Sequence, residues 1–175
     1  TMNGDEVIVN ADVLINDNRI AGVGRRGRIQ IPTAARQMDV RGSYIVPGFV
    51  DTHAHYEMRT EGVLELHNWS FLANLAYGVT TGLDVQTSTN DYLTYQDLVE
   101  AGMMIGPRSY STGPGVFSNT DFQSADSAFY VLQKYKKFYR NHNLKSYVVG
   151  NRKQRQWVVR AASELELTVT TEGAL

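Results

Sequence analysis

The stretch Val46-Pro47-Gly48-Phe49-Val50-Asp51-Thr52-His53-Ala54-His55 carries the strongest signal in the chain. Its β-branched and aromatic residues, which follow Pro-Gly, predict a strand. Side chains alternate along a strand, so the spacing places both histidines on one face together with Asp51. Two neutral imidazoles on one strand can bind a zinc-type ion, and a neighbouring carboxylate can orient one of them. Alternatively, the two histidines have no metal-binding role and are partly buried at the strand end, where they form hydrogen bonds with the backbone.

The residues that follow alternate between two patterns. Extended stretches are expected near 45–53, 78–85, 107–113, 144–149 and 167–172, and helices at 62–77, 91–104, 126–140 and 152–166. Strands that alternate with helices predict an α/β fold with a parallel sheet. An open doubly wound sheet and a closed barrel both satisfy this pattern. Because a (β/α)8 barrel takes roughly 250 residues, this chain would carry about the first four to five of its units.

The residues before Val46 predict a separate β module. Val7–Val9, Val13–Ile15 and Arg28–Ile31 are short β-rich runs, and Asn, Asp and Gly residues mark turns between them. We therefore expect residues 1–45 to form a small β-sandwich portion and residues 46–175 to form the α/β domain. The letters of 22–27 match G-x-G-x-x-G, but an extended run follows where a nucleotide site needs a helix, which favours a β-turn.

Composition excludes several classes of function. There are 17 Lys+Arg and 18 Asp+Glu, which give a net charge of -1, and there is no cysteine. This balance offers no electrostatic basis for binding nucleic acid or an anionic membrane. The absence of cysteine excludes a disulfide scaffold and a thiolate metal site. It leaves the cellular compartment open.

The stretch from Val46 to His55 resembles the PGxVDxHxH motif of the amidohydrolase superfamily. The matching residues are Pro47, Gly48, Val50, Asp51, His53 and His55. The resemblance continues through 74–81, 106–108, 111–113, 144–147 and 172–173, and so spans nearly the whole chain. It is greatest to the imidazolonepropionase- and prolidase-like branch, particularly to members fused to a β-propeller. This resemblance implies the N-terminal half of a TIM barrel, preceded by part of a β-sandwich.

The resemblance also implies a set of site residues. His53 and His55 would be metal ligands, and Lys145 would be a catalytic, CO2-carboxylated lysine that bridges two ions. Alternation places Lys145 on the interior face of its strand, although a lysine at a strand start can also extend to solvent. Glu172 stands where many members have a metal-binding histidine. It is therefore a candidate ligand, or else a polar strand end.

The function implied by the resemblance is metal-dependent hydrolysis of C–N bonds in a small-molecule amide or peptide-like substrate. One or two divalent ions, zinc first among them, would activate water. A sixth-strand histidine and an eighth-strand aspartate would follow the chain's last residue. We therefore expect the isolated chain to be inactive and to self-associate through uncovered strand edges. The alternative is a non-catalytic βα scaffold or binding module. Propeller-fused relatives are often exported, which favours the periplasm over the cytoplasm.

Overall fold

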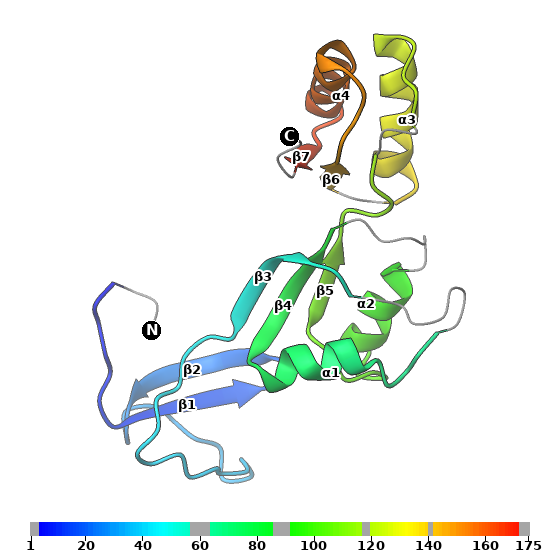
Figure 1. Ribbon diagram of the computed structural model, residues 1–175. Coiled ribbons are helices and arrows are strands. Elements are labelled where there is room, and N and C mark those ends of the chain that lie inside the picture. The colour runs from blue at the N-terminus through cyan, green and yellow to red at the C-terminus, as the bar shows by residue number, and fades with distance from the viewer. Residues whose placement is uncertain (1–3, 57–63, 86–91, 117–119, 140–141, 172–175) are drawn as a thin grey trace. The chain divides into compact units, whose positions relative to one another are not determined.

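The computed structural model describes residues 4–56, 64–85, 92–116, 120–139 and 142–171 of the chain. The chain divides into two compact units, Thr1–Pro47 and Gly48–Leu175. The elements in order are β1 (Ala11–Asn16), β2 (Arg19–Arg25), β3 (Phe49–Ala54), α1 (Trp69–Ala76), β4 (Val79–Asp84), α2 (Tyr92–Glu100), β5 (Arg108–Ser111), α3 (Ala125–Lys137), β6 (Asn143–Ser146), α4 (Arg152–Glu164) and β7 (Thr168–Thr171) (Figure 1).

The first unit contains an antiparallel hairpin of β1 and β2. Two of the three runs expected to be strands, Val7–Val9 and Arg28–Ile31, lie outside the strands. The glycines of 22–24 lie inside β2 and not in a turn. The reason is packing, because Ile29 covers this part of β2 and a Cβ added at Gly24 would lie 3.0 Å from its Cγ2. The G-x-G-x-x-G letters therefore belong to a strand and the turn that follows it.

The second unit is an α/β structure with parallel strands, as the sequence predicts. β3, β4 and β5 form one parallel sheet, and β6 and β7 form a second. A parallel bridge joins Val116, which follows β5, to Ser146 at the end of β6. The Val116 N–H donates to the Lys145 carbonyl at 2.8 Å, and the Tyr147 N–H donates to the Val116 carbonyl at 3.0 Å. These bonds link β5 and β6 through the segment after β5, while closure into a barrel stays a prediction.

Side chains at the helix ends explain where the helices begin and stop. α1 begins later than predicted because Asn68 caps it by accepting from the Ser70 and Phe71 N–H groups. It ends at Ala76, and Gly78, the residue after the C-cap Tyr77, has a φ of 82°, the left-handed conformation that glycine adopts without strain. α3 and α4 begin at capping boxes formed by Ser124 and Asn151. Within the described ranges, no helix has the length and apolar character needed to cross a membrane.

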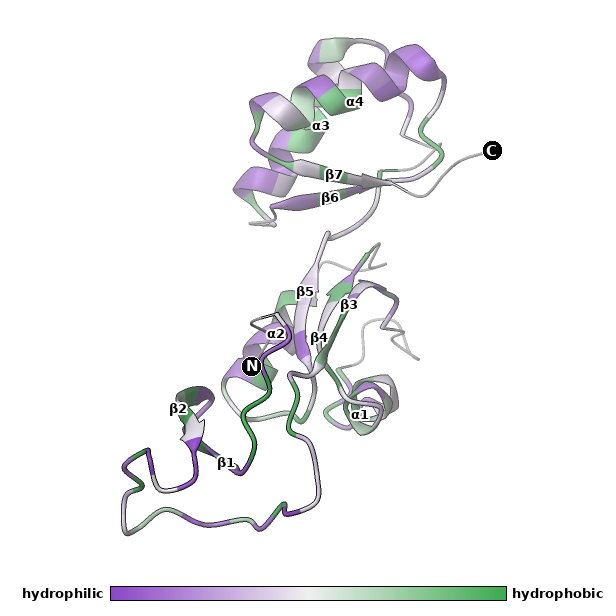
Figure 2. Ribbon diagram, turned by 90° about the vertical axis from the view of Figure 1, so that its left-hand side faces the viewer, coloured by the Kyte–Doolittle hydropathy of each residue, from purple (hydrophilic) through white to green (hydrophobic). Residues whose placement is uncertain are grey.

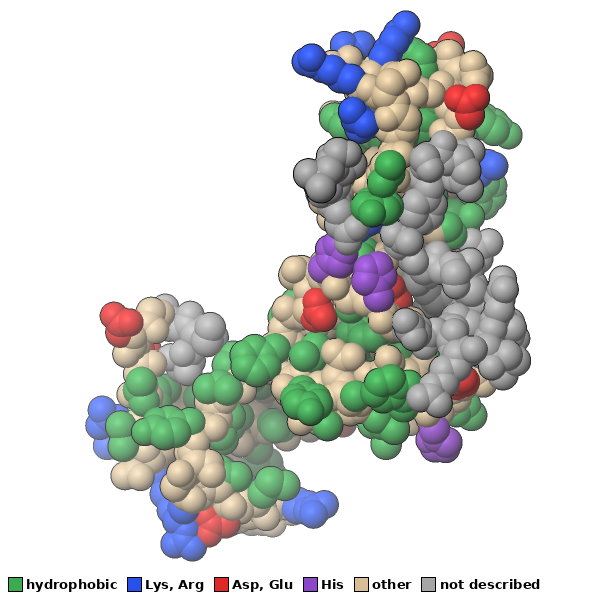
Figure 3. Space-filling view, in the orientation of Figure 1, with side chains coloured by type: hydrophobic (Ala, Val, Ile, Leu, Met, Phe, Trp, Pro, Cys, Tyr) green, Lys and Arg blue, Asp and Glu red, His purple; other side chains and the backbone are tan. Residues whose placement is uncertain are grey.

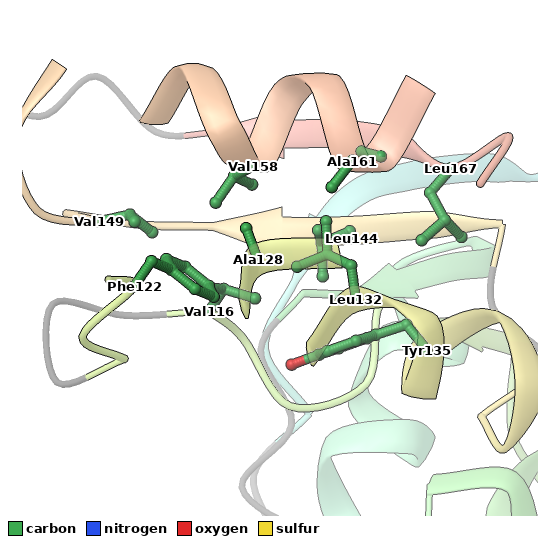
Figure 4. Packing of buried hydrophobic residues seen from close by; sticks show 11 residues of the cluster. Val116, Phe122, Ala128, Leu132, Tyr135, Leu144, Val149, Val158, Ala161 and Leu167 are labelled. Atoms are coloured by element: carbon green, nitrogen blue, oxygen red, sulfur yellow. The ribbon is translucent and has the colours of Figure 1, made fainter. Parts of the chain in front are cut away.

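Two apolar clusters hold the second unit together. The larger packs α3 and α4 against β6 and its neighbours, and Figure 4 shows Leu132, Leu144 and Val158 within it. Figure 2 shows the hydrophobic stretches of these helices among hydrophilic ones, the pattern of helices with one buried face. The smaller cluster joins the end of β3 to α1 and α2 through Tyr56, Phe71 and Tyr95.

Candidate functional site

His53 and His55 lie next to each other at the carboxyl end of β3. Their ring centroids are 5.4 Å apart, in an edge-to-face arrangement. Both residues are exposed, and two histidine side chains lie together on the face shown in Figure 3. The carboxyl ends of parallel strands are where α/β proteins gather functional groups. The structure therefore brings together the two imidazoles that the sequence pairs.

A β-bulge shapes the backbone of this pair. Asp51 is in register with Gly82 and Ala54 is in register with Asp84, so β3 has one more residue than β4 in this interval. Alternation holds from His53 onward, because His53 and His55 are exposed whereas Ala54 and Tyr56 are buried. Asp51 acts on the pair, because its Oδ1 accepts a hydrogen bond from the His53 N–H at 2.9 Å. The carboxylate thus stabilises the backbone of the bulge.

Lys145 lies beside His53, although the two residues are 92 positions apart in the sequence. Its Nζ is 3.4 Å from the His53 Nε2 and 5.6 Å from the centroid of the Tyr147 ring. The lysine has no solvent exposure. It therefore points into the interior, as alternation along its strand predicts, and does not extend to solvent. An ammonium group in such a place is costly unless its neighbours stabilise it or it loses its charge.

Asp84 is a second buried ionisable group near the histidines, and the sequence analysis overlooked it. The residue is 7% exposed, and its Oδ2 accepts a hydrogen bond from the Tyr56 N–H at 3.3 Å. The sequence does contain an indication of its role. Asp84 follows a β-rich run, and an acidic residue at the carboxyl end of a parallel strand lies where functional sites form. Without a motif, that position alone did not distinguish it from the other acidic residues.

Burial shifts the ionisation of this region. It raises the pKa of Asp84 to about 7, although the hydrogen bond from the Tyr56 N–H acts in the opposite direction. Burial also raises the pKa of Tyr56 to about 12, and the charges of Asp51 and Asp84 add to the effect. The Tyr56 hydroxyl is buried and, among the described residues, has no hydrogen-bond partner. Tyr56 is therefore neutral at physiological pH, and Asp84 titrates there.

The donor set suits a metal ion in part. Imidazole nitrogens are preferred ligands of zinc, and His53 and His55 offer a pair of them close together. Over the described ranges, no three histidine, aspartate or glutamate side chains come together as a metal site. Glu172 lies outside the described residues. The remaining histidines, His67 and His142, are exposed, as expected of surface residues.

The chain is similar to known proteins in sequence and in structure. No protein-family model matches the chain. An adenine deaminase of Deinococcus deserti is 47% identical over 51 residues, which is 29% of this chain and 9% of the relative. An imidazolonepropionase of Salinispora tropica is 35% identical over 78 residues, which is 45% of this chain and 18% of the relative.

Two solved structures share the fold over most of the chain. A Xaa-Pro dipeptidase with bound methionine in its active site superposes with a TM-score of 0.68, at 16% identity, over 92% of this chain and 51% of that protein. A bottromycin amidohydrolase superposes with a TM-score of 0.63, at 19% identity, over 91% of this chain and 33% of that protein. The chain thus spans about half of the dipeptidase and a smaller part of the other relatives.

Proposed function

The relatives and structural neighbours indicate the amidohydrolase superfamily over short segments, and on that premise we propose that this chain supplies part of a metal-dependent hydrolase that cleaves C–N bonds. The observation that carries the proposal is the approach of Lys145 Nζ to His53 Nε2 at 3.4 Å, across 92 residues of sequence. With His55 beside His53, three nitrogen-bearing side chains from two strands gather at one place.

We propose that His53 and His55 hold a divalent ion, with zinc the first candidate. Lys145, as a carbamate, and Glu172 are the further proposed ligands. A divalent ion in such a site lowers the pKa of water and polarises the bond to be cleaved. Zinc sites that do chemistry use about three protein ligands and keep one position open, which fits two histidines plus a further donor.

The chain's own residues have separable tasks in this proposal. His53 and His55 bind, and the Asp51 carboxylate holds the His53 backbone at 2.9 Å so that its ring keeps one direction. Lys145, which has no exposure, keeps water away from the inner side of the pair. The Tyr147 ring, 5.6 Å from the Lys145 Nζ, forms a wall beside it. These groups bind, orient and exclude water.

The names of the relatives support a proposal for the substrate class. Deaminases, an imidazolonepropionase and a dipeptidase are named among them. We propose a small cyclic amide, amidine or peptide-like substrate whose C–N bond is hydrolysed. The chain covers 51% of the dipeptidase, so we also propose that the isolated chain is inactive or nearly so.

Metal binding by the chain tests the proposal. The purified chain should be titrated with Zn²⁺ by calorimetry and with Co²⁺ by absorption spectroscopy. His53→Asn and His55→Asn should each weaken binding by at least about tenfold, because each removes one of few donors. His67→Asn is the matched control, since it removes an exposed histidine outside the pair. Equal affinities in all four proteins would refute the proposal.

The state of Lys145 needs a separate measurement. If the lysine is carboxylated, chain exposed to ¹³C-bicarbonate and Zn²⁺ should show a carbamate carbon signal in its NMR spectrum. Lys145→Arg should lack this signal, because a guanidinium does not form the carbamate. A wild-type spectrum without the signal would remove Lys145 from the ligand set and leave the histidine pair to be judged by the titration.

A further inference from the structure

The end of β4 carries a carboxyl group where the interior would be expected to be apolar. Asp84 is 7% exposed, and it contacts the chain segments after both neighbouring strands. Its Oδ2 accepts a hydrogen bond from the Tyr56 N–H at 3.3 Å, beyond the end of β3. Its backbone carbonyl accepts from the Thr112 N–H at 3.0 Å, beyond the end of β5. The aspartate thus ties together the carboxyl ends of three parallel strands.

The side chain continues the hydrogen-bond ladder past the point where the strands end. The Val85 N–H donates to the Ala54 carbonyl at 3.0 Å, as in a regular parallel pair. In such a pair the next bond would run from the Tyr56 N–H to the backbone carbonyl of Val85, the residue after β4. The Asp84 carboxyl oxygen accepts this bond instead. Both sequence neighbours of His55 are therefore attached to the end of β4.

The Tyr56 side chain strengthens this attachment. Its ring lies 4.8 Å from the Phe71 ring of α1, and the residue is 8% exposed. Its hydroxyl reaches the backbone of β4 so closely that a Cβ added at Gly82 would lie 1.8 Å from the oxygen. Only glycine leaves room for the tyrosine there. The residue after His55 is thus held by its N–H and by its ring.

We propose that Asp84 is a positioning residue for the histidine pair and holds His55 in the direction needed to bind a cation. His55 is exposed, so its direction depends on the backbone on either side of it. Ala54 and Tyr56 supply that backbone, and Asp84 holds the second of them. This inference rests on the proposed function, because it assumes that the pair binds a metal ion. Supporting residues of this kind change metal affinity by about 10–100-fold in metalloproteins.

The test compares substitutions that keep or remove the acceptor. Asp84→Asn keeps a carbonyl oxygen for the Tyr56 N–H, and Asp84→Leu removes it at similar size. Zn²⁺ affinity and the Co²⁺ absorption spectrum should be measured for both. Asp84→Leu should lose about tenfold or more in affinity and show an altered spectrum, while Asp84→Asn should stay within about threefold of wild type. Asp97→Leu is the control, because it removes an exposed aspartate from α2.

Asp84→Glu and His53→Asn distinguish a failure of the positioning role from a failure of the proposed function. If Asp84→Leu does not fold, Asp84→Glu replaces it, because this variant keeps the acid and moves it by one methylene. It should bind Zn²⁺ more weakly than Asp84→Asn. If His53→Asn leaves metal affinity unchanged, the proposed function itself fails. If His53→Asn weakens binding but the Asp84→Leu or Asp84→Glu protein binds like wild type, the positioning role is wrong and the metal site stands.

Discussion

The buried carboxyl of Asp84 should make the chain less stable as pH rises. An unfolded aspartate ionises near 3.8, whereas burial raises the pKa of Asp84 in the folded chain to about 7. Between these values the folded chain binds more protons than the unfolded chain. The contribution of the group to stability is therefore fully present below the unfolded pKa, and it is lost as pH rises to the folded pKa.

The size of the effect follows from the shift. Each pKa unit corresponds to about 1.4 kcal/mol, so the full shift is worth about 4 kcal/mol. Part of this change in the free energy of unfolding occurs below about pH 4.5. We therefore expect the free energy of unfolding to fall by roughly 3 kcal/mol between about pH 4.5 and pH 8. With a urea dependence of about 2 kcal/mol per molar, the unfolding midpoint should fall by roughly 1.5 M over this range.

Urea unfolding of the wild-type chain and of Asp84→Asn is the assay. The amide does not ionise, so the difference between the two proteins isolates the contribution of Asp84 from those of the other titratable groups. That difference should change by roughly 3 kcal/mol from about pH 4.5 to pH 8, with the wild type losing stability relative to the variant. A difference that stays constant with pH, or changes in the opposite direction, would refute the assignment of a raised pKa to Asp84.

Three further substitutions test other parts of the structure by urea unfolding at a single pH. Tyr56→Phe removes a buried hydroxyl without a partner among the described residues, so stability should stay equal or rise by up to about 1 kcal/mol; a clear loss would mean that the hydroxyl is bonded. Asn68→Ala removes the cap of α1 and should cost about 1 kcal/mol, whereas Asn68→Asp, which keeps the acceptor, should cost much less. Leu132→Ala opens a cavity in the cluster of α3 and α4 and should cost about 2–5 kcal/mol; a smaller loss would indicate that the cluster is loosely packed.

Local patterns were sufficient for much of the second unit. The helical spacing of apolar residues around Leu132 and Val158 predicted α3 and α4, which the structure confirms to within a few residues. The prediction was weaker in the first unit, where β propensity suggested a strand at Arg28–Ile31 and turns at Gly22 and Gly24. The glycines allow close packing here, because Ile29 lies against Gly22 and Gly24 of β2, which have no side chains. Propensity describes single residues, whereas strand formation depends on a partner.

For the candidate site, the sequence by itself determined the two histidines and their closeness, because they lie two positions apart on one predicted strand. It also determined the parallel α/β frame, because strand and helix patterns alternate along the chain. Only the tertiary structure decided that Lys145 meets His53 and that Asp84 holds the residue after His55. It also introduced the irregular register between Asp51 and Ala54. These features depend on which strands are neighbours and in what register they pair. Hydrogen bonds between distant segments set both, and no local spacing encodes them.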